Sequence, residues 1–415
     1  MTNVVGEIAR LRLSRFPPFK PCAIIGLMNH QPTHIGLNAH LLSLSQSYRG
    51  AGISWYITNL LKNLAQVSPG SFRYTAFLSD RTLQAPSLKL NFSRLPTQRP
   101  IIRILWEQLL QPLVLRRSRV DLLHALAFVA PLAAPCPFVV TVYDLSFLRY
   151  PESFRPFNRW YLTRFTTHSV KRARAVIAIS ESTRQDVINF LGVPAGQVHT
   201  IYCGVDETFR PLPTAAIAAF KARHHLPETF ILFLGTLEPR KNVDGLIRAY
   251  ARWRERDPAA PPLILAGGQG WYYTEIFKLV ETLNLTDCIY FPGYISQESL
   301  PLWYNAASLF IYPSHFEGFG LPVLEAMACG TPVIASAVSS LPEVTGVDGA
   351  ACLVDPADLE ALAEAMAHLM SRSELRADMS ARGLARAAEF RWAKTARETV
   401  AVYQKVITSF HNRSS

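Results

Sequence analysis

Two glutamates eight positions apart, Glu317 and Glu325, lie in the segment where residues suited to chemistry are most concentrated. Gly318 and Gly320 between them would let the backbone approach a ligand closely. Pro322 suits the first position of a helix, where its missing N–H leaves no intrahelical bond unmade. The segment therefore predicts a glycine-rich turn between a strand and a helix, with Glu325 about one turn into the helix.

The start of that helix would suit a phosphate group. Backbone amides at a helix N-terminus point toward a ligand, and the helix dipole favours negative charge. Glu325 could then accept hydrogen bonds from sugar hydroxyls, with Glu317 at the mouth of the turn. The alternative is a helix N-terminus with two ordinary acidic residues. The amides concerned are those of Phe319, Gly320 and Leu321.

A basic pair, Arg240 and Lys241, follows the strand predicted over Phe230–Leu234 and precedes a helix that begins near Val243. Adjacent arginine and lysine can neutralise a diphosphate through charge-assisted hydrogen bonds without a metal ion. A lone pair of this kind is usually solvated surface. Its position at the carboxyl end of a strand favours ligand binding, because α/β proteins bind ligands there.

Three isolated residues in the first half are further candidates. Gly52 lies in Gly-Ala-Gly-Ile-Ser before a helix predicted over Tyr56–Val67, where a phosphate-facing loop and a simple turn are both open. His124 ends a predicted strand, and an isolated histidine is more often structural than catalytic. Asp144 follows another strand, and the same alternative applies to it.

Short apolar runs alternate with amphipathic helical stretches from His34 onward, which is typical of a parallel α/β fold. The proline-containing stretch Asp206–Leu226 separates two series of strands, and a last helix over about Trp392–Ser409 follows the second series. Two Rossmann-like domains with a ligand cleft between them are therefore expected. The predicted strands are Ile35–Ala39, Tyr74–Leu78, Leu122–Ala125, Pro137–Val142, Ala175–Ile179, Phe230–Leu234, Leu263–Ala266, Cys288–Phe291, Ser308–Tyr312, Pro332–Ala335 and Ala351–Val354.

The composition excludes several classes of protein. With 415 residues, 49% hydrophobic and 18% charged, the chain is neither disordered nor of low complexity. Six cysteines without a Cys-x-x-Cys pair indicate neither a disulfide framework nor a zinc site, and favour a cytoplasmic location. The uncharged stretch 122–143 contains three prolines, so strand, loop and strand are expected there rather than a membrane helix. Residues 1–33 fit neither domain; a flexible extension and a true start at Met28 are both open.

Positive charge is concentrated in the first half. Residues 1–210 carry 24 Lys/Arg and 10 Asp/Glu, a balance of +14, whereas residues 211–415 carry 18 and 21, a balance of −3. An anionic partner and a solvated basic surface are both consistent with this. Nucleic acid is not the expected partner, because no nucleic-acid-binding motif is present.

The apolar stretch Ile101–Leu115 has arginines at both ends. A helix of this kind could rest on the anionic inner face of a membrane. A core helix with charged ends, limited in length by Pro112, is the alternative. The arginines are Arg99, Arg103, Arg116, Arg117 and Arg119.

Taken together, these motifs resemble those of the family 4 retaining glycosyltransferases of the GT-B fold, especially the bacterial mannosyltransferase-like branch, over about residues 34–405. The segment from Glu317 to Gly330 is similar to the family's E-G-F-G-L-P-x-L-E-A-M-A-x-G string, and Gly235–Asn242 to its pyrophosphate-binding turn. Cys203–Asp206 and Phe291–Ile295 resemble the family's end of the first domain and its base-contacting segment. Pro342-Glu343-Val344 after two serines also fits.

The resemblance implies an acceptor-binding domain over 34–206, a linker over 207–227, a nucleotide-sugar-binding domain over 228–385, and a helix over 386–409 crossing back to the first domain. It implies a metal-independent hexosyltransferase with two parallel sheets facing across a cleft. The co-substrate would be a nucleotide diphosphate sugar, with no cofactor, and the acceptor a saccharide or lipid-linked glycan.

It also assigns a role to each candidate. Glu317 and His124 would contact the transferred sugar as the catalytic residues, Glu325 the ribose, and Arg240 and Lys241 the pyrophosphate. Gly52 would face the phosphates, Asp144 the acceptor, and Ile295 the base, alongside the amides of Phe319, Gly320 and Leu321.

The sequence departs from the family pattern at four positions: Ser54 and Thr236 replace a glycine and an arginine, Tyr143 a histidine, and Cys203 an asparagine. None of these positions is either glutamate. Two alternatives stay open on the same architecture, a nucleotide-sugar epimerase and a catalytically silent nucleotide-sugar-binding protein.

Overall fold

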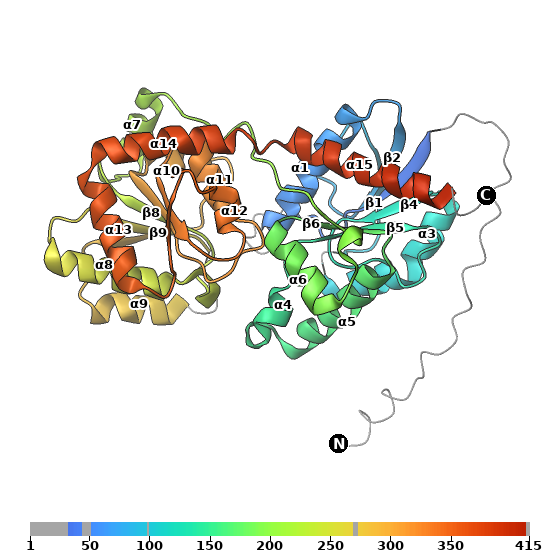
Figure 1. The fold of residues 1–415 in the computed structure, drawn as a ribbon, viewed down its shortest axis with the longest axis horizontal. Coiled ribbons are helices and arrows are strands. Elements are labelled where there is room, and N and C mark those ends of the chain that lie inside the picture. Colours follow the sequence, from blue (N-terminus) through green and yellow to red (C-terminus); the bar gives the residue numbers. More distant parts are fainter. Residues whose placement is uncertain (1–31, 44–50, 98, 269–272, 412–415) are drawn as a thin grey trace, which may run out of the picture. The chain divides into compact units, whose positions relative to one another are not determined.

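The computed structural model describes residues 32–43, 51–97, 99–268 and 273–411. The predicted N-terminal extension lies outside these ranges, apart from its last two residues. Residues Thr33–Ser415 form one compact unit with two parallel sheets (Figure 1).

The first sheet has seven strands in the order β3-β2-β1-β4-β5-β6-β7. In β1, Ile35 pairs with Leu122 of β4, and Thr33 with Phe72 of β2. The side chains of β4 and β5 are buried along their whole length, as expected for a parallel sheet covered on both faces. The strands are β1 Thr33–Asn38, β2 Phe72–Leu78, β3 Lys89–Phe92, β4 Leu122–Ala125, β5 Phe138–Val142, β6 Ala175–Ala178 and β7 Val198–Thr200.

The second sheet repeats this topology with six strands in the order β10-β9-β8-β11-β12-β13. Leu309 of β11 pairs with Ile231 of β8. In both sheets the strand order reverses beside the first strand, which is the topological switch point at which such folds bind ligands. The strands are β8 Ile231–Leu234, β9 Leu263–Ala266, β10 Ile289–Gly293, β11 Leu309–Tyr312, β12 Val333–Ser336 and β13 Cys352–Val354.

Helices connect the parallel strands, as right-handed crossovers require. They are α1 Ala51–Val67, α2 Pro100–Leu105, α3 Gln111–Arg117, α4 Ser146–Arg149, α5 Pro156–Arg172, α6 Glu181–Leu191, α7 Thr214–Arg223, α8 Val243–Arg256, α9 Tyr273–Thr282, α10 Leu300–Ala306, α11 Leu321–Ala328, α12 Leu341–Thr345, α13 Leu359–Ser371, α14 Ser373–Ala387 and α15 Trp392–His411. A π-helical segment, Trp106–Leu110, joins α2 to α3, and short 3₁₀ turns cover Pro151–Ser153, Ala195–Gln197 and Pro239–Lys241.

The last helix, α15, packs against α1, although it follows the second sheet in sequence (Figure 1). Trp392 contacts Tyr56 of α1 edge-on, and the Thr395 hydroxyl donates to the Tyr202 carbonyl. No helix among the described residues is long and apolar enough to cross a membrane.

The predicted α/β fold with two Rossmann-like sheets is confirmed, and each of the eleven predicted strands is present within two residues at either end. The edge strands β3 and β7 were not predicted. The predicted domain limits stay predictions.

Candidate functional site

The candidate site of the second sheet lies at its switch point, where β8 and β11 are neighbours. The turn after β8 carries Arg240 and Lys241, and the turn after β11 carries Glu317. Because parallel strands end at the same edge of a sheet, the two turns meet. The His315 amide donates to the Arg240 carbonyl at 2.9 Å.

Glu317 forms ion pairs with both cations of the neighbouring turn. The Lys241 Nζ lies 2.6 Å from Glu317 Oε1, and the Arg240 guanidinium 3.4 Å from Oε2. Lys241 and Glu317 are each 7% exposed. The Lys241 ammonium also donates to the Tyr312 hydroxyl at the end of β11.

The charges in this cluster hold Glu317 ionised. Burial acts to raise the pKa of Glu317, but the positive charges of Lys241 and Arg240 outweigh it and hold the pKa below its ordinary value. Burial acts to lower the pKa of Arg240, whereas the negative charges of Glu317, Glu238 and Asp144 raise it. Asp144 of the first sheet therefore contributes to the electrostatics of this site. The guanidinium also donates to Glu238 at 2.9 Å.

The turn that carries Glu317 is fixed by two serines. Ser339 Oγ accepts from the Glu317 amide at 3.0 Å, and Ser340 Oγ donates to the carbonyls of Glu317 and Phe319. Gly320 caps α11 at φ +106°, and a Cβ there would lie 2.5 Å from Leu341. Only glycine fits this position without strain.

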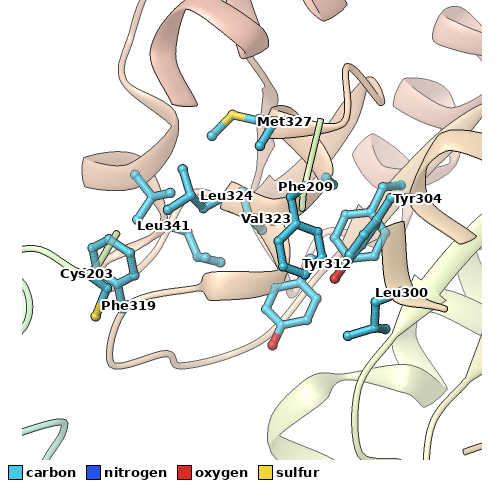
Figure 2. Packing of buried hydrophobic residues seen from close by; sticks show 14 of the residues in the cluster. Cys203, Phe209, Leu300, Tyr304, Tyr312, Phe319, Val323, Leu324, Met327 and Leu341 are labelled. Carbon is cyan, nitrogen blue, oxygen red and sulfur yellow. The ribbon is translucent and has the colours of Figure 1, made fainter. Parts of the chain in front are cut away.

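Glu325 is buried on α11, where it accepts from the Tyr304 hydroxyl at 2.9 Å. Burial raises the pKa of Glu325 to about 8, so the carboxyl is mostly protonated at neutral pH. Figure 2 shows Val323, Leu324 and Met327 of the same helix among apolar neighbours, with Tyr304 alongside. This packing holds the helix, and with it Glu325, in one position.

The other predicted residues of the second half lie as follows. The Phe319 ring is buried against Tyr202 and Phe390, and Leu321 opens α11 in a half-buried position. Ile295 is half-buried just beyond β10. The candidate residues of the turns after β8 and β11 are thus brought together, whereas no described contact joins Ile295 to them.

In the first half, Gly52 is exposed and lies within the first turn of α1. The prediction that Gly52 precedes the helix is wrong, because α1 begins at Ala51, five residues before the predicted start at Tyr56. Asp144 accepts from the amide and hydroxyl of Ser146, the first residue of α4.

His124 is a core residue, which corrects the prediction that it contacts a sugar. Its side chain has no exposed surface, its Nδ1 pairs with the Tyr403 hydroxyl at 2.6 Å, and its Nε2 pairs with the Thr141 hydroxyl at 2.8 Å. Burial lowers the pKa of His124 to about 3, so the ring is neutral. No ring nitrogen is left for a substrate.

Two tyrosines of the site were not predicted. Tyr312 receives a hydrogen bond from Lys241, with the lysine Nζ 4.8 Å from the ring centroid, and Tyr304 binds Glu325. Tyr312 ends β11 beside the switch point, and its position at the end of a predicted strand could have identified it as a site residue. Tyr304 lies within α10, and no sequence pattern indicated that it belongs to the site.

Two family models cover most of the chain. Residues 50–209 match the family described as "Glycosyltransferase Family 4", and residues 217–386 match "Glycosyl transferases group 1". The boundary between the matches falls between the two sheets.

Two curated relatives are mannosyltransferases of Escherichia coli. The chain is 35% identical to O-antigen chain mannosyltransferase B over 268 residues, which are 64% of this chain and 70% of that one. It is 33% identical to the serotype-specific mannosyltransferase WbdA over 257 residues, 61% of this chain but 31% of that one.

Solved structures show the same fold at low identity. Sucrose-phosphate synthase from Thermosynechococcus elongatus matches with a TM-score of 0.72 and 23% identity, over 91% of this chain and 100% of that one. HepE of Anabaena, solved in complex with UDP and glucose, matches with a TM-score of 0.70 and 20% identity, over 89% and 99%.

The fold is GT-B, and the family matches show that the protein is a glycosyltransferase. The chain belongs to family 4, in its mannosyltransferase-like branch.

Proposed function

We propose that the protein transfers a hexose, mannose first among candidates, from a nucleotide diphosphate donor to a saccharide or lipid-linked glycan, with retention of configuration. The observation that carries this is the Lys241–Glu317–Arg240 cluster at the switch point of the second sheet. The related mannosyltransferases support the sugar, and neighbouring structures with UDP support a nucleotide donor. The O-antigen relative supports a role in surface polysaccharide synthesis.

In this proposal Arg240 and Lys241 bind the donor pyrophosphate, and the backbone at the start of α11 binds phosphate oxygens. Their positive charge offsets the charge that develops as the bond between the sugar C1 and the phosphate oxygen breaks. Glu317 first holds the two cations in place, and its carboxylate then accepts from a hydroxyl of the transferred sugar. Glu325 accepts from the ribose hydroxyls.

The acceptor hydroxyl attacks C1 on the face from which the phosphate leaves. A new C1–O bond forms there, and the hydroxyl proton passes to the departing phosphate oxygen. The protein's contribution is to position both substrates and to neutralise charge. Two fixed cations supply the charge that a metal ion would otherwise supply, so the reaction is proposed to be metal-independent.

Substitution of Lys241 tests the proposal. Lys241→Ala removes a buried donor aimed at the developing charge, so kcat is expected to fall on the order of 100-fold. Arg240→Gln, at a more exposed side chain, is the second variant should Lys241→Ala fold poorly. Lys278→Met, at an exposed helical lysine, is the matched control. The measurement is transfer of radiolabelled sugar from a panel of nucleotide sugars to glycan acceptors, with and without a chelator.

Full turnover by folded Lys241→Ala contradicts the proposed role of Lys241. Loss of wild-type turnover when a chelator is added contradicts the proposed metal independence. Epimerised donor without glycoside product would instead identify the nucleotide-sugar epimerase. Donor binding without transfer would identify the silent binding protein.

A further inference from the structure

Large apolar side chains are exposed along one stretch of the first half. Ile101, Leu105, Leu109 and Leu113 are 66%, 53%, 63% and 53% exposed. Single exposed leucines are common on protein surfaces, but a contiguous apolar stripe marks an interaction surface.

The four side chains recur at every fourth position through α2, the π-helical segment and α3. In a continuous α-helix a spacing of four drifts steadily around the axis, because one turn holds 3.6 residues. The π-helical segment has wider turns and offsets this drift, so the stripe stays on one side. The other side is buried in the core through Trp106 and Leu115, which leaves the stripe exposed.

Helix α5 lies beside the π-helical segment, with Tyr161 near Glu107, and exposes two more large apolar side chains. Phe157 and Trp160 are 57% and 58% exposed, and their rings lie 6.1 Å apart. The loop at Leu132 contacts both elements: its amide donates to Gln108 of the π-helical segment, and its carbonyl accepts from Arg172 at the C-terminal end of α5. We call the exposed side chains of Ile101, Leu105, Leu109, Leu113, Phe157 and Trp160 the apolar surface.

The surroundings of the apolar surface are basic. Residues 99–119 contain five arginines and a single acidic residue, Glu107, which is buried. Residues 155–174 contain six basic residues and no acidic one. Exposed arginines therefore flank the apolar surface; they include Arg99, Arg116, Arg117, Arg155, Arg159 and Arg164.

We propose that the apolar surface docks on an anionic lipid bilayer, with its leucines and aromatic rings at the boundary between headgroups and acyl chains and the flanking arginines against lipid phosphates. A tryptophan ring suits this boundary, since one edge is polar and the rest apolar. The inference goes beyond the proposed function and does not depend on it. A bilayer would also be the place where a lipid-linked acceptor is met, at the cytoplasmic face.

Charge complementarity selects this partner over two others. A second copy of the chain would oppose its own arginines, and like charges across a two-fold interface repel. Nucleic acid would be bound by the arginines, but six exposed apolar side chains would add little to phosphate contacts.

The experiment is flotation of the full chain with phosphatidylcholine vesicles, with and without phosphatidylglycerol, in the absence of any nucleotide sugar. Binding to the anionic vesicles only, weakened by high salt, is the expected result. Leu105→Gln with Leu109→Gln, and separately Arg116→Gln with Arg117→Gln, should each weaken it on the order of tenfold. Val347→Gln, and Arg223→Gln with Arg248→Gln, are the matched controls at exposed positions of the second half.

Equal binding to both vesicle types, or unchanged binding by both double variants, overturns the proposal. The proposal is also overturned if the wild-type protein binds no vesicles and instead forms a dimer that the Leu105→Gln with Leu109→Gln variant dissociates. Transfer to a water-soluble acceptor, measured on the same variants, should be unchanged. Failure of vesicle binding with transfer intact would therefore overturn only the docking surface.

Discussion

At the residue scale, the site contains two carboxyl groups in different protonation states, one ionised and one neutral. Glu317 is ionised because Lys241 and Arg240 neutralise it, whereas Glu325 has only the Tyr304 hydroxyl as its described partner and burial favours its neutral form. In the proposed function, Glu317 orders the two cations and Glu325 accepts hydrogen bonds from the ribose hydroxyls.

Glu325 should give stability a distinctive pH dependence. Its pKa is raised from 4.5 to about 8, so between these values the folded chain holds a proton that the unfolded chain has released. Folding stability therefore falls as the pH rises through this window, by up to about 4 kcal/mol. The glutamine side chain of Glu325→Gln cannot ionise, so the stability of this variant should not fall as the pH rises through this window. The variant should therefore be more stable than wild type at pH 8 but not at pH 4.

The measurement is chemical denaturation of both proteins across this pH range, with the KM for the nucleotide sugar measured at pH 7. The variant should be the more stable protein at pH 8, with a KM close to that of wild type at pH 7, because glutamine resembles the protonated carboxyl group. Parallel stability profiles for the two proteins would show that Glu325 is not held neutral.

At the element scale, the N-terminus of α11 requires Gly320, whereas the first turn of α1 does not require Gly52. Gly320→Ala would place a methyl group against Leu341 at positive φ, so a loss of about 1–3 kcal/mol is expected. At Gly52 an added Cβ meets nothing within 4 Å, and alanine favours a helix. Gly52→Ala should therefore leave the midpoint of thermal unfolding unchanged or raised.

Gly52→Ala also tests the proposed approach of this backbone to donor phosphates. If the phosphates lie against Gly52, the added methyl group raises the KM for the donor while the unfolding midpoint does not fall. Unchanged kinetics would remove Gly52 from the site, and an unfolding midpoint for Gly320→Ala equal to wild type would refute the strain at α11.

Sequence patterns located elements and strand-end residues well, but not the partners that decide their roles. Arg240 and Glu317 stood out as polar residues after apolar strands, yet their pairing follows from the strand order at the switch point. His124 was misassigned because its partner, Tyr403, is 279 positions away, and the expected return of the last helix did not identify which residues it would contact. The edge strand β3 was missed because none of its side chains is fully buried, so its apolar signal is short.

At the scale of the whole molecule, α15 ties the end of the chain to its first sheet. The helix follows the second sheet in sequence, but Tyr403 binds His124 of β4 and Thr395 binds Tyr202. The resemblance predicted such a return of the last helix. The contact with α15 explains why His124, near the end of β4, is a core residue. The candidate donor-site residues lie instead after β8 and β11.

Tyr403→Phe tests this role of α15. Removing the hydroxyl leaves the buried His124 Nδ1 without its described partner, so a loss of about 1–3 kcal/mol is expected. A lower thermal midpoint with unchanged kcat and an unchanged pH–rate profile is the expected outcome. Thr399→Ser, on the same buried face of α15, keeps its hydroxyl and serves as the control. A shifted pH–rate profile at unchanged stability would return His124 to the catalytic machinery, since a merely structural histidine has no proton to exchange with the substrate.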